Sequence, residues 1–280
     1  MTDKKVLTFQ DISCLGQCSL TVALPIISAC GIETIILPSA VLSTHTGCFP
    51  GYTFHDLTED IPGIMNHWKQ SELSFDCLYT GYLGSITQIE YAKELRKSVI
   101  SSDGLFIVDP VMADDGRLYS GFTPDFVKEM AGLCAEADII LPNITEACFM
   151  TGTEPRLYDH DEKYVTDLIN RLSDFGASKI ILKGICFEPN KIGVAIKDNT
   201  TNELSYYFTD KNPKNSPGTG DCYASAFVGS LISGLGLYDS AALAADFVLE
   251  CIKKTADDST HTYGVKFEKA LPMLINKLNV

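Results

Sequence analysis

Short apolar runs alternate with longer amphipathic stretches along almost the whole chain, and this alternation strongly limits the folds open to it. Strands that alternate with helices form a mostly parallel sheet covered by helices on both faces. The sequence therefore predicts a three-layer α/β/α fold with a mostly parallel central sheet. Strands are expected at 6–9, 32–37, 77–80, 105–108, 138–141 and 179–184, a hairpin at 192–196 and 204–208, and helices at 19–29, 53–70, 86–100, 122–135, 163–175, 223–232, 237–254 and 265–278.

Size and charge narrow the classes of function. The 280 residues contain no internal repeat or linker, so residues 1–280 are expected to form a single domain. The net charge is −14, which argues against nucleic acid and anionic membranes as partners because both require a basic surface. A phosphorylated ligand stays compatible, since its charge can be met locally.

The ten cysteines are scattered, and no Cys-x-x-Cys pair occurs among them. This pattern is typical of small buried hydrophobic residues in a reducing compartment rather than of disulfides or a zinc site. The N-terminal residues show no signal peptide, and no apolar run is long enough to cross a membrane. A cytoplasmic location is expected.

One glycine-rich turn combines the features of an anion site and a base. Gly218-Thr219-Gly220-Asp221 stands directly before an apolar helix. Glycines let backbone N–H groups approach a ligand, and a helix N-terminus favours negative charge. The simpler interpretation of Asp221 is an N-cap. The functional interpretation is that the amides stabilise a phosphoryl group while Asp221 accepts a proton from an attacking hydroxyl.

Polar residues also follow several of the predicted strands, at the sheet edge where α/β proteins bind ligands. Each has a structural alternative: a loop carboxylate for Asp109 and Asp114, a capping box for Asn143 with Glu146, and a snorkelling surface lysine for Lys183. The functional alternative is an ATP and Mg²⁺ centre, because hard cations prefer carboxylate oxygens and a lysine can reach phosphates.

Two further segments follow strands in the N-terminal half. Thr44-His45-Thr46 comes after one of them, and for His45 alone a structural role is the more common outcome. The segment 81–85, Gly-Tyr-Leu-Gly-Ser, comes after another, and its glycines indicate either close approach of the backbone to a ligand or a tight turn.

Taken together and in this order, the motifs resemble those of the ribokinase-like superfamily, and within it the pyridoxal kinase family. The carrying residues are Thr44-His45-Thr46, Gly-Tyr-Leu-Gly-Ser at 81–85, Asp109-Pro110-Val111-Met112, Pro142-Asn143 with Glu146, and Gly218-Thr219-Gly220-Asp221. The resemblance covers the chain from its first strand to its last helix. It implies a ribokinase-like fold, a homodimer, and ATP-dependent phosphorylation of the 5′-hydroxymethyl group of pyridoxal, pyridoxine or pyridoxamine.

The resemblance also implies a role for each matched position. Asp221 would be the catalytic base, and residues 218–220 would form the anion hole. The vitamer would be bound by Thr46, His45 and Tyr82. ATP would be bound by Asp109, Asp114, Asn143, Glu146, Lys183, Gly218 and Thr219, with Mg²⁺ near Asp109 and, through water, Glu146. Residues 114–119 would form a short lid.

One position departs from the family pattern. Pyridoxal kinases usually carry Ile-Gln-Ser-His after the first strand, and the serine bonds the pyridine ring. Here Asp11 stands at that place, or Ser13 if the alignment is shifted. A carboxylate can accept a bond from a protonated ring nitrogen or the 3-hydroxyl. A carboxylate here is also compatible with the alternative that the chain is a hydroxymethylpyrimidine kinase. A third alternative is a carrier of pyridoxal phosphate without catalysis, which the intact Asp221 disfavours.

Overall fold

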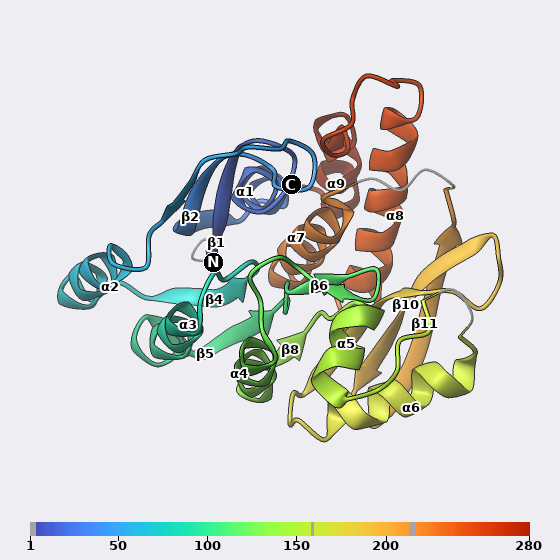
Figure 1. The fold of residues 1–280 in the computed structure, drawn as a ribbon, viewed down its shortest axis with the longest axis horizontal. Coiled ribbons are helices and arrows are strands. Elements are labelled where there is room, and N and C mark those ends of the chain that lie inside the picture. The colour runs from blue at the N-terminus through green and yellow to red at the C-terminus, as the bar shows by residue number, and fades with distance from the viewer. Residues whose placement is uncertain (1–3, 158–159, 213–216) are drawn as a thin grey trace.

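The computed structural model describes residues 4–157, 160–212 and 217–280. Its centre is a nine-stranded sheet in the order β11-β10-β9-β8-β5-β4-β1-β2-β3. The strands from β9 to β2 are parallel to one another, and antiparallel strands complete both ends (Figure 1). The strands are β1 (Lys5–Leu15), β2 (Glu33–Thr44), β3 (Phe54–Asp56), β4 (Phe75–Thr80), β5 (Ile100–Val108), β8 (Ile139–Ile140), β9 (Lys179–Ile185), β10 (Lys191–Asp198) and β11 (Glu203–Asp210).

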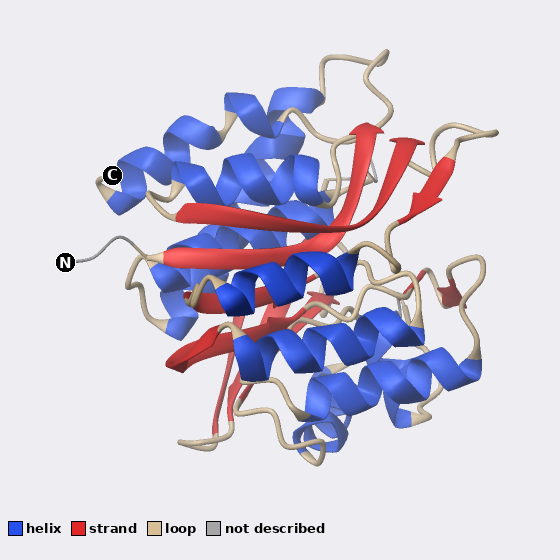
Figure 2. Ribbon diagram, turned by 90° about the vertical axis from the view of Figure 1, so that its left-hand side faces the viewer, coloured by secondary structure: helices blue, strands red, loops and turns tan. Residues whose placement is uncertain are grey.

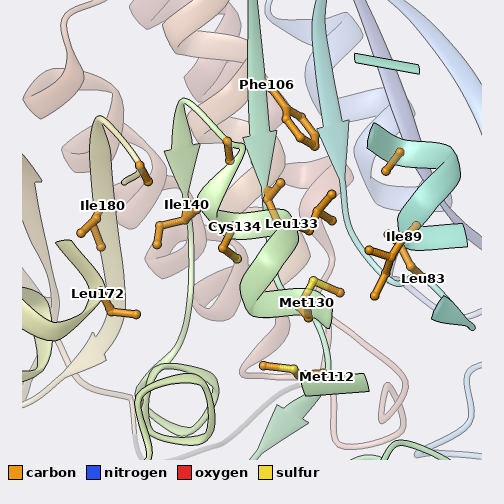
Figure 3. Packing of buried hydrophobic residues seen from close by; sticks show 14 of the residues in the cluster. Leu83, Ile89, Phe106, Met112, Met130, Leu133, Cys134, Ile140, Leu172 and Ile180 are labelled. Carbon is orange, nitrogen blue, oxygen red and sulfur yellow. The ribbon is translucent and has the colours of Figure 1, made fainter. Parts of the chain in front are cut away.

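Helices cover both faces of this sheet, as the alternating pattern predicts (Figure 2). One face packs against α2 to α6, and the other against α1, α7, α8 and α9, so each face has its own apolar core. Figure 3 shows part of the first core, where Phe106 and Ile140 of the sheet lie near Leu133 of α4. The helices are α1 (Leu20–Ala29), α2 (Ile61–Gln70), α3 (Ile86–Ser98), α4 (Pro124–Ala135), α5 (Ile144–Thr151), α6 (Glu162–Ser173), α7 (Thr219–Ile232), α8 (Leu237–Thr255) and α9 (Leu271–Leu278), with a 3₁₀ turn η1 (Phe267–Lys269) before the last.

The predicted helix at 53–70 is wrong over residues 53–60, nearly half of its length. Residues Phe54–Asp56 instead form β3, which pairs with Ala40–Leu42 of β2, and α2 begins only at Ile61 with a proline in its first turn. The predicted helix at 265–278 is likewise divided into η1 and α9. In both places tertiary contacts override the local helical pattern.

Strand β2 is twice as long as predicted, and β1, with 11 residues, is nearly three times as long. Their register slips between Gln10 and Ile12 of β1, so Asp11 lies at an irregularity inside the strand and not in a loop after it. Irregularities of this kind redirect side chains and often occur near active sites. The period-2 pattern cannot reveal such a slip, which explains the short prediction.

The remaining findings concern segments outside the main sheet. All ten cysteines are free, and most of them are buried, as expected. No helix in the described ranges is long and apolar enough to span a membrane. A small hairpin, β6 (Ala113–Asp114) and β7 (Arg117–Leu118), follows β5 and turns at Asp115 and Gly116, both with positive φ. Residues 213–216, which precede the glycine-rich turn, lie outside the described residues.

Candidate active site

Helix α7 begins at the glycine-rich turn, and its start is fixed by close packing. Gly218 is the N-cap with φ 73°, and a Cβ at this position would lie 1.9 Å from the carbonyl oxygen of Gln17. Only glycine meets both conditions. At Gly220 a Cβ would meet no atom within 4 Å, so space is open beside the first turn of α7. The backbone amides of this turn can therefore be reached by an anion.

Asp221 lies in the first turn of α7 and is held from the opposite end of the chain. The N–H of Ser19, 202 positions away in the sequence, donates to its Oδ2 at 2.9 Å. Burial raises the pKa of Asp221, while the Ser19 N–H and the charges of Lys183 and His45 oppose that rise. One carboxylate oxygen is thus anchored, and the group is partly buried among charges, as a general base requires.

The residue that anchors Asp221 has a strained backbone. Ser19 has φ 52° and ψ −135°, a conformation that a residue with a Cβ rarely adopts. Its hydroxyl also lies near Asp11 and lowers the pKa of that carboxyl. Such strain persists only where the surroundings impose it, and it is concentrated at functional sites. Ser19 therefore joins two carboxylates of the site.

A buried ion pair lies within electrostatic range of Asp221. Lys183 of β9 contacts Asp109, which follows β5, with 2.7 Å between Nζ and Oδ2. Burial raises the pKa of Asp109 to about 6 despite the lysine. Burial lowers the pKa of Lys183, but the charges of Asp109 and Glu146 raise it by more than burial lowers it, so the net shift is upward. The pair thus carries a permanent cation in the range of Asp221, as a phosphate site requires.

Asn143 and Glu146 form the capping box at the start of α5, which is the structural alternative. Asn143 Oδ1 accepts from the Glu146 N–H at 2.8 Å, and Glu146 Oε2 accepts from the Asn143 N–H at 2.8 Å. The second Glu146 oxygen accepts from the Met112 N–H at 3.3 Å. Burial, followed by the charge of Asp109, raises the pKa of Glu146 well above its usual range. Glu146 is therefore close to the ion pair, with both oxygens already bonded.

A divalent cation would find one open protein oxygen in this region. Asp109 Oδ1 is buried and has no hydrogen-bond partner within the described ranges. No group of three or more histidine, cysteine, aspartate or glutamate side chains suited to a metal occurs there. This donor set fits Mg²⁺ that keeps most of its waters and binds phosphate oxygens, which is its usual mode in nucleotide sites.

The predicted lid residues lie on the β6–β7 hairpin beside this region. Asp114 lies on β6, and partial burial of its carboxyl raises its pKa. Asn143 Nδ2 donates to the Ala113 oxygen at 2.9 Å, which ties the hairpin to the start of α5. Tyr119, just past β7, has its phenol pKa raised by burial and then by the charge of Glu146. The hairpin is thus connected to the carboxylate cluster.

A second group of residues combines a buried carboxylate with aromatic rings near β1. Asp11 is only 5% exposed, and Ser13 Oγ donates to its Oδ2 at 3.2 Å. Burial, followed by the charge of Asp11, raises the pKa of Tyr82 to about 12, so the two are neighbours. The Tyr82 ring lies 5.5 Å from Phe122, at the base of the β6–β7 hairpin. An acceptor and an aromatic face are what a flat heteroaromatic ring requires.

The two predicted residues of the β2–β3 loop differ in their surroundings. His45 is partly buried; burial lowers its pKa, and the charge of Asp221 raises it. Its Nδ1 lies 3.3 Å from Cys48 Sγ. Thr46 is exposed, and no hydrogen bond within the described ranges connects it to the other predicted site residues. The structure therefore brings His45 within electrostatic range of Asp221 and leaves Thr46 exposed.

Asp11 permits a prediction on stability. Burial raises its pKa from 3.8 to about 6, so the folded chain holds this proton more tightly than the unfolded chain. Ionisation between about pH 4 and 6 therefore costs folding free energy, roughly 3 kcal/mol at most above that range. Asp11→Asn should raise the melting temperature at pH 7.5 and change it little at pH 4. A variant with equal effects at both pH values would contradict this origin.

Several contact residues were missed from the sequence. Ser19, Gln17 and Phe122 carry no motif, because their roles arise from contacts between distant loops. Ser13 was considered only as an alternative to Asp11, whereas the two are hydrogen-bonded to each other. A signal did exist for Gln17, since it adjoins Gly16 in a turn that follows a strand.

Known proteins share this fold and part of its sequence. Residues 67–265 match the family model of phosphomethylpyrimidine kinase. A Bacteroides thetaiotaomicron protein, provisionally assigned to the same kinases and crystallised with pyridoxal, is 36% identical, with a TM-score of 0.92 over 98% of this chain and 96% of its own. Pyridoxal kinase from Lactobacillus plantarum is 30% identical, with a TM-score of 0.89 over 98% and 97%. Pyridoxal kinase from Dictyostelium discoideum is 26% identical over 81% of this chain and 78% of its own.

Proposed function

This chain belongs to the family of phosphomethylpyrimidine and pyridoxal kinases, and from that premise we propose that it uses ATP to phosphorylate the 5′-hydroxymethyl group of vitamin B6 vitamers. The observation that carries the proposal is the position of Asp221. It lies in the first turn of α7, beside open space at Gly220, and within the electrostatic influence of Lys183. A proton acceptor, an anion-binding helix end and a fixed cation are the parts that phosphoryl transfer to an alcohol requires.

The reaction follows from these positions. Asp221 accepts the proton of the vitamer hydroxyl, whose oxygen forms a bond to the γ-phosphorus of ATP. The bond from that phosphorus to the β–γ bridging oxygen breaks, and ADP leaves with the charge. Amides of residues 218–220 and the Lys183 ammonium stabilise charge on the phosphoryl oxygens. Asp114, on the β6–β7 hairpin, and Asn143, which is hydrogen-bonded to that hairpin, would contact the nucleotide.

Mg²⁺ would be held by Asp109 and reached through water by Glu146, and it would neutralise phosphate charge. Its fit rests on the open Asp109 oxygen. The vitamer ring would lie between Asp11 and Tyr82, with His45 and Thr46 on the side of the β2–β3 loop. The protein crystallised with pyridoxal, at 36% identity, supports this choice of substrate.

A hydroxymethylpyrimidine kinase is the second candidate. The matching family model is that of phosphomethylpyrimidine kinase, and a buried carboxylate at position 11 can accept a bond from an aminopyrimidine as well as from a pyridine. The aromatic neighbours of Asp11 suit both rings. Substrate turnover separates the two candidates.

The test is ATP consumption with Mg²⁺ in the presence of pyridoxal, pyridoxine, pyridoxamine or hydroxymethyl-aminopyrimidine. We expect turnover with at least one B6 vitamer and a kcat/KM for it that exceeds that for the pyrimidine. Turnover on the pyrimidine alone would retain the mechanism and refute the B6 assignment. Tight vitamer binding without any turnover would indicate a carrier instead.

The proposal includes three broader features. We propose that residues 1–280 act as one kinase domain, because one sheet runs through the described chain. Family resemblance supports a homodimer. The free cysteines support a reducing, cytoplasmic location.

A further inference from the structure

The segment that joins α8 to η1, residues 256–266, lies against two loops that carry site residues. We call it the α8–η1 connector. It is itself well fixed, because Lys266 pairs with Asp258 and the Lys266 N–H donates to Thr255 Oγ1 at 2.8 Å. The proposed function assigns no role to it.

Its main contact is with Gln17, in the loop between β1 and α1. The Gln17 N–H donates to the Tyr263 oxygen at 3.1 Å, and the Gln17 Oε1 accepts from His261 Nε2 at 2.7 Å. The side-chain Nε2 of Gln17 donates to Glu268 Oε1 of η1 at 2.8 Å. A Cβ at Gly264 would lie 2.4 Å from Gln17 Cβ, so the connector backbone also packs directly on this side chain.

The other side of the same loop meets the catalytic turn. The backbone carbonyl oxygen of Gln17 occupies the place that a Cβ on Gly218 would need. Two residues later, the Ser19 N–H donates to Asp221 at 2.9 Å. Ser19 holds this donor position with a strained backbone, so something must keep the loop from relaxing. The contacts of Gln17 with the connector can hold the loop in this conformation.

A second contact joins the connector to the β2–β3 loop. Cys48 Sγ donates to the Thr262 oxygen at 3.6 Å, and the rings of Phe49 and Tyr263 have centroids 5.9 Å apart. His45 belongs to this loop, and its charge acts on Asp221. One connector therefore contacts both loops that surround the base.

We propose that Gln17, held by His261 of the α8–η1 connector, is a positioning residue that fixes the Ser19 donor and the Gly218 turn around Asp221. The inference rests on the proposed role of Asp221 as base. It extends that role to a segment far from the reacting atoms.

The expected consequence is catalytic and depends on pH. The Ser19 N–H lowers the pKa of Asp221, so its displacement raises that pKa and moves the acid limb of the kcat profile to higher pH. The other groups that act on Asp221, or are acted on by it, stay in place. They are Asp11 of β1, Cys18 of the β1–α1 loop, His45 of the β2–β3 loop, Tyr79 of β4, Asp109 after β5, Tyr119 after β7, Lys183 of β9 and Cys222 of α7.

The experiment measures kcat, KM and pH profiles for Gln17→Ala, His261→Ala and His261→Gln, the last of which keeps a donor for Gln17. We expect kcat to fall 10- to 100-fold in the two alanine variants, with a smaller change in vitamer KM, an acid limb shifted to higher pH, and partial rescue in His261→Gln. His67→Ala, at an exposed histidine of α2, is the matched control. A purely structural role would lower the melting temperature without moving the acid limb, and that result would overturn the proposal.

A double variant separates this inference from the proposed function. If Gln17 acts through Asp221, Gln17→Ala should cause no further loss of kcat in an Asp221→Ala background. Additive losses would refute the positioning role while leaving the base intact. If Asp221→Ala alone keeps normal turnover, the assignment of the base itself fails.

Discussion

Replacement of Asp221 by alanine or asparagine is expected to lower kcat by about 10³-fold, because general-base catalysis contributes roughly 10² to 10⁴. The loss should fall on kcat more than on the KM values. In the proposed mechanism the carboxylate, which is anchored by Ser19, acts on the reacting hydroxyl, whereas the groups around the ring and the ion pair stay in place. Steady-state kinetics with the best vitamer, combined with vitamer affinity measured by calorimetry, tests this directly.

The Asp221→Asn variant should be at least as stable as the wild type, so unfolding would not explain its loss of kcat. Burial raises the pKa of Asp221, and the nearby Asp11 and Asp109 add negative charge, so a neutral asparagine removes an unfavourable charge at pH 7.5. The melting temperature should be retained or increased. Asp239→Asn is the matched control, since Asp239 lies exposed in the first turn of α8. Normal kcat in Asp221→Asn would contradict the assignment of the base.

The layered fold could be predicted from the sequence because it depends on local periodicity. Runs such as 105–108 and 179–184 are apolar enough to indicate buried parallel strands, and both occur in the sheet. The errors lie where a distant strand decides the outcome. Phe54–Asp56 became β3 because an edge of β2 was available to it, a fact that no local pattern contains.

The site was predictable to the extent that its residues follow strands. Asp109, Asn143 and Lys183 meet because parallel strands bring their carboxyl ends to one edge. What the sequence could not show is how these groups are held. The Ser19 donor to Asp221 and the Gln17 oxygen against Gly218 are contacts between loops about 200 residues apart. Glu146 serves as a capping residue and still lies close to the ion pair, so the two interpretations of Asn143 and Glu146 are not exclusive.

The second large effect is expected for Lys183→Met. This change leaves Asp109 buried without the lysine that pairs with it, and breaking such a pair costs about 3–5 kcal/mol. It also removes the fixed cation from the proposed phosphate site, where loss of one stabilising group costs roughly 10²- to 10³-fold in kcat. Chemical denaturation measures the first effect, and ATP turnover at saturating vitamer measures the second.

A paired substitution separates these two contributions. In Lys183→Met with Asp109→Asn, the Asp109 carboxylate is no longer left buried without its cation, so most of the lost stability should return. Activity should stay low, because neither the ammonium charge nor the Asp109 carboxylate has been restored. Lys179→Met, on the same strand β9, controls for loss of a lysine and should change both quantities little. If the double variant regains turnover together with stability, Lys183 serves the fold and has no part in phosphate binding. If it regains stability alone, the charges of this pair are required for turnover and not only for the fold.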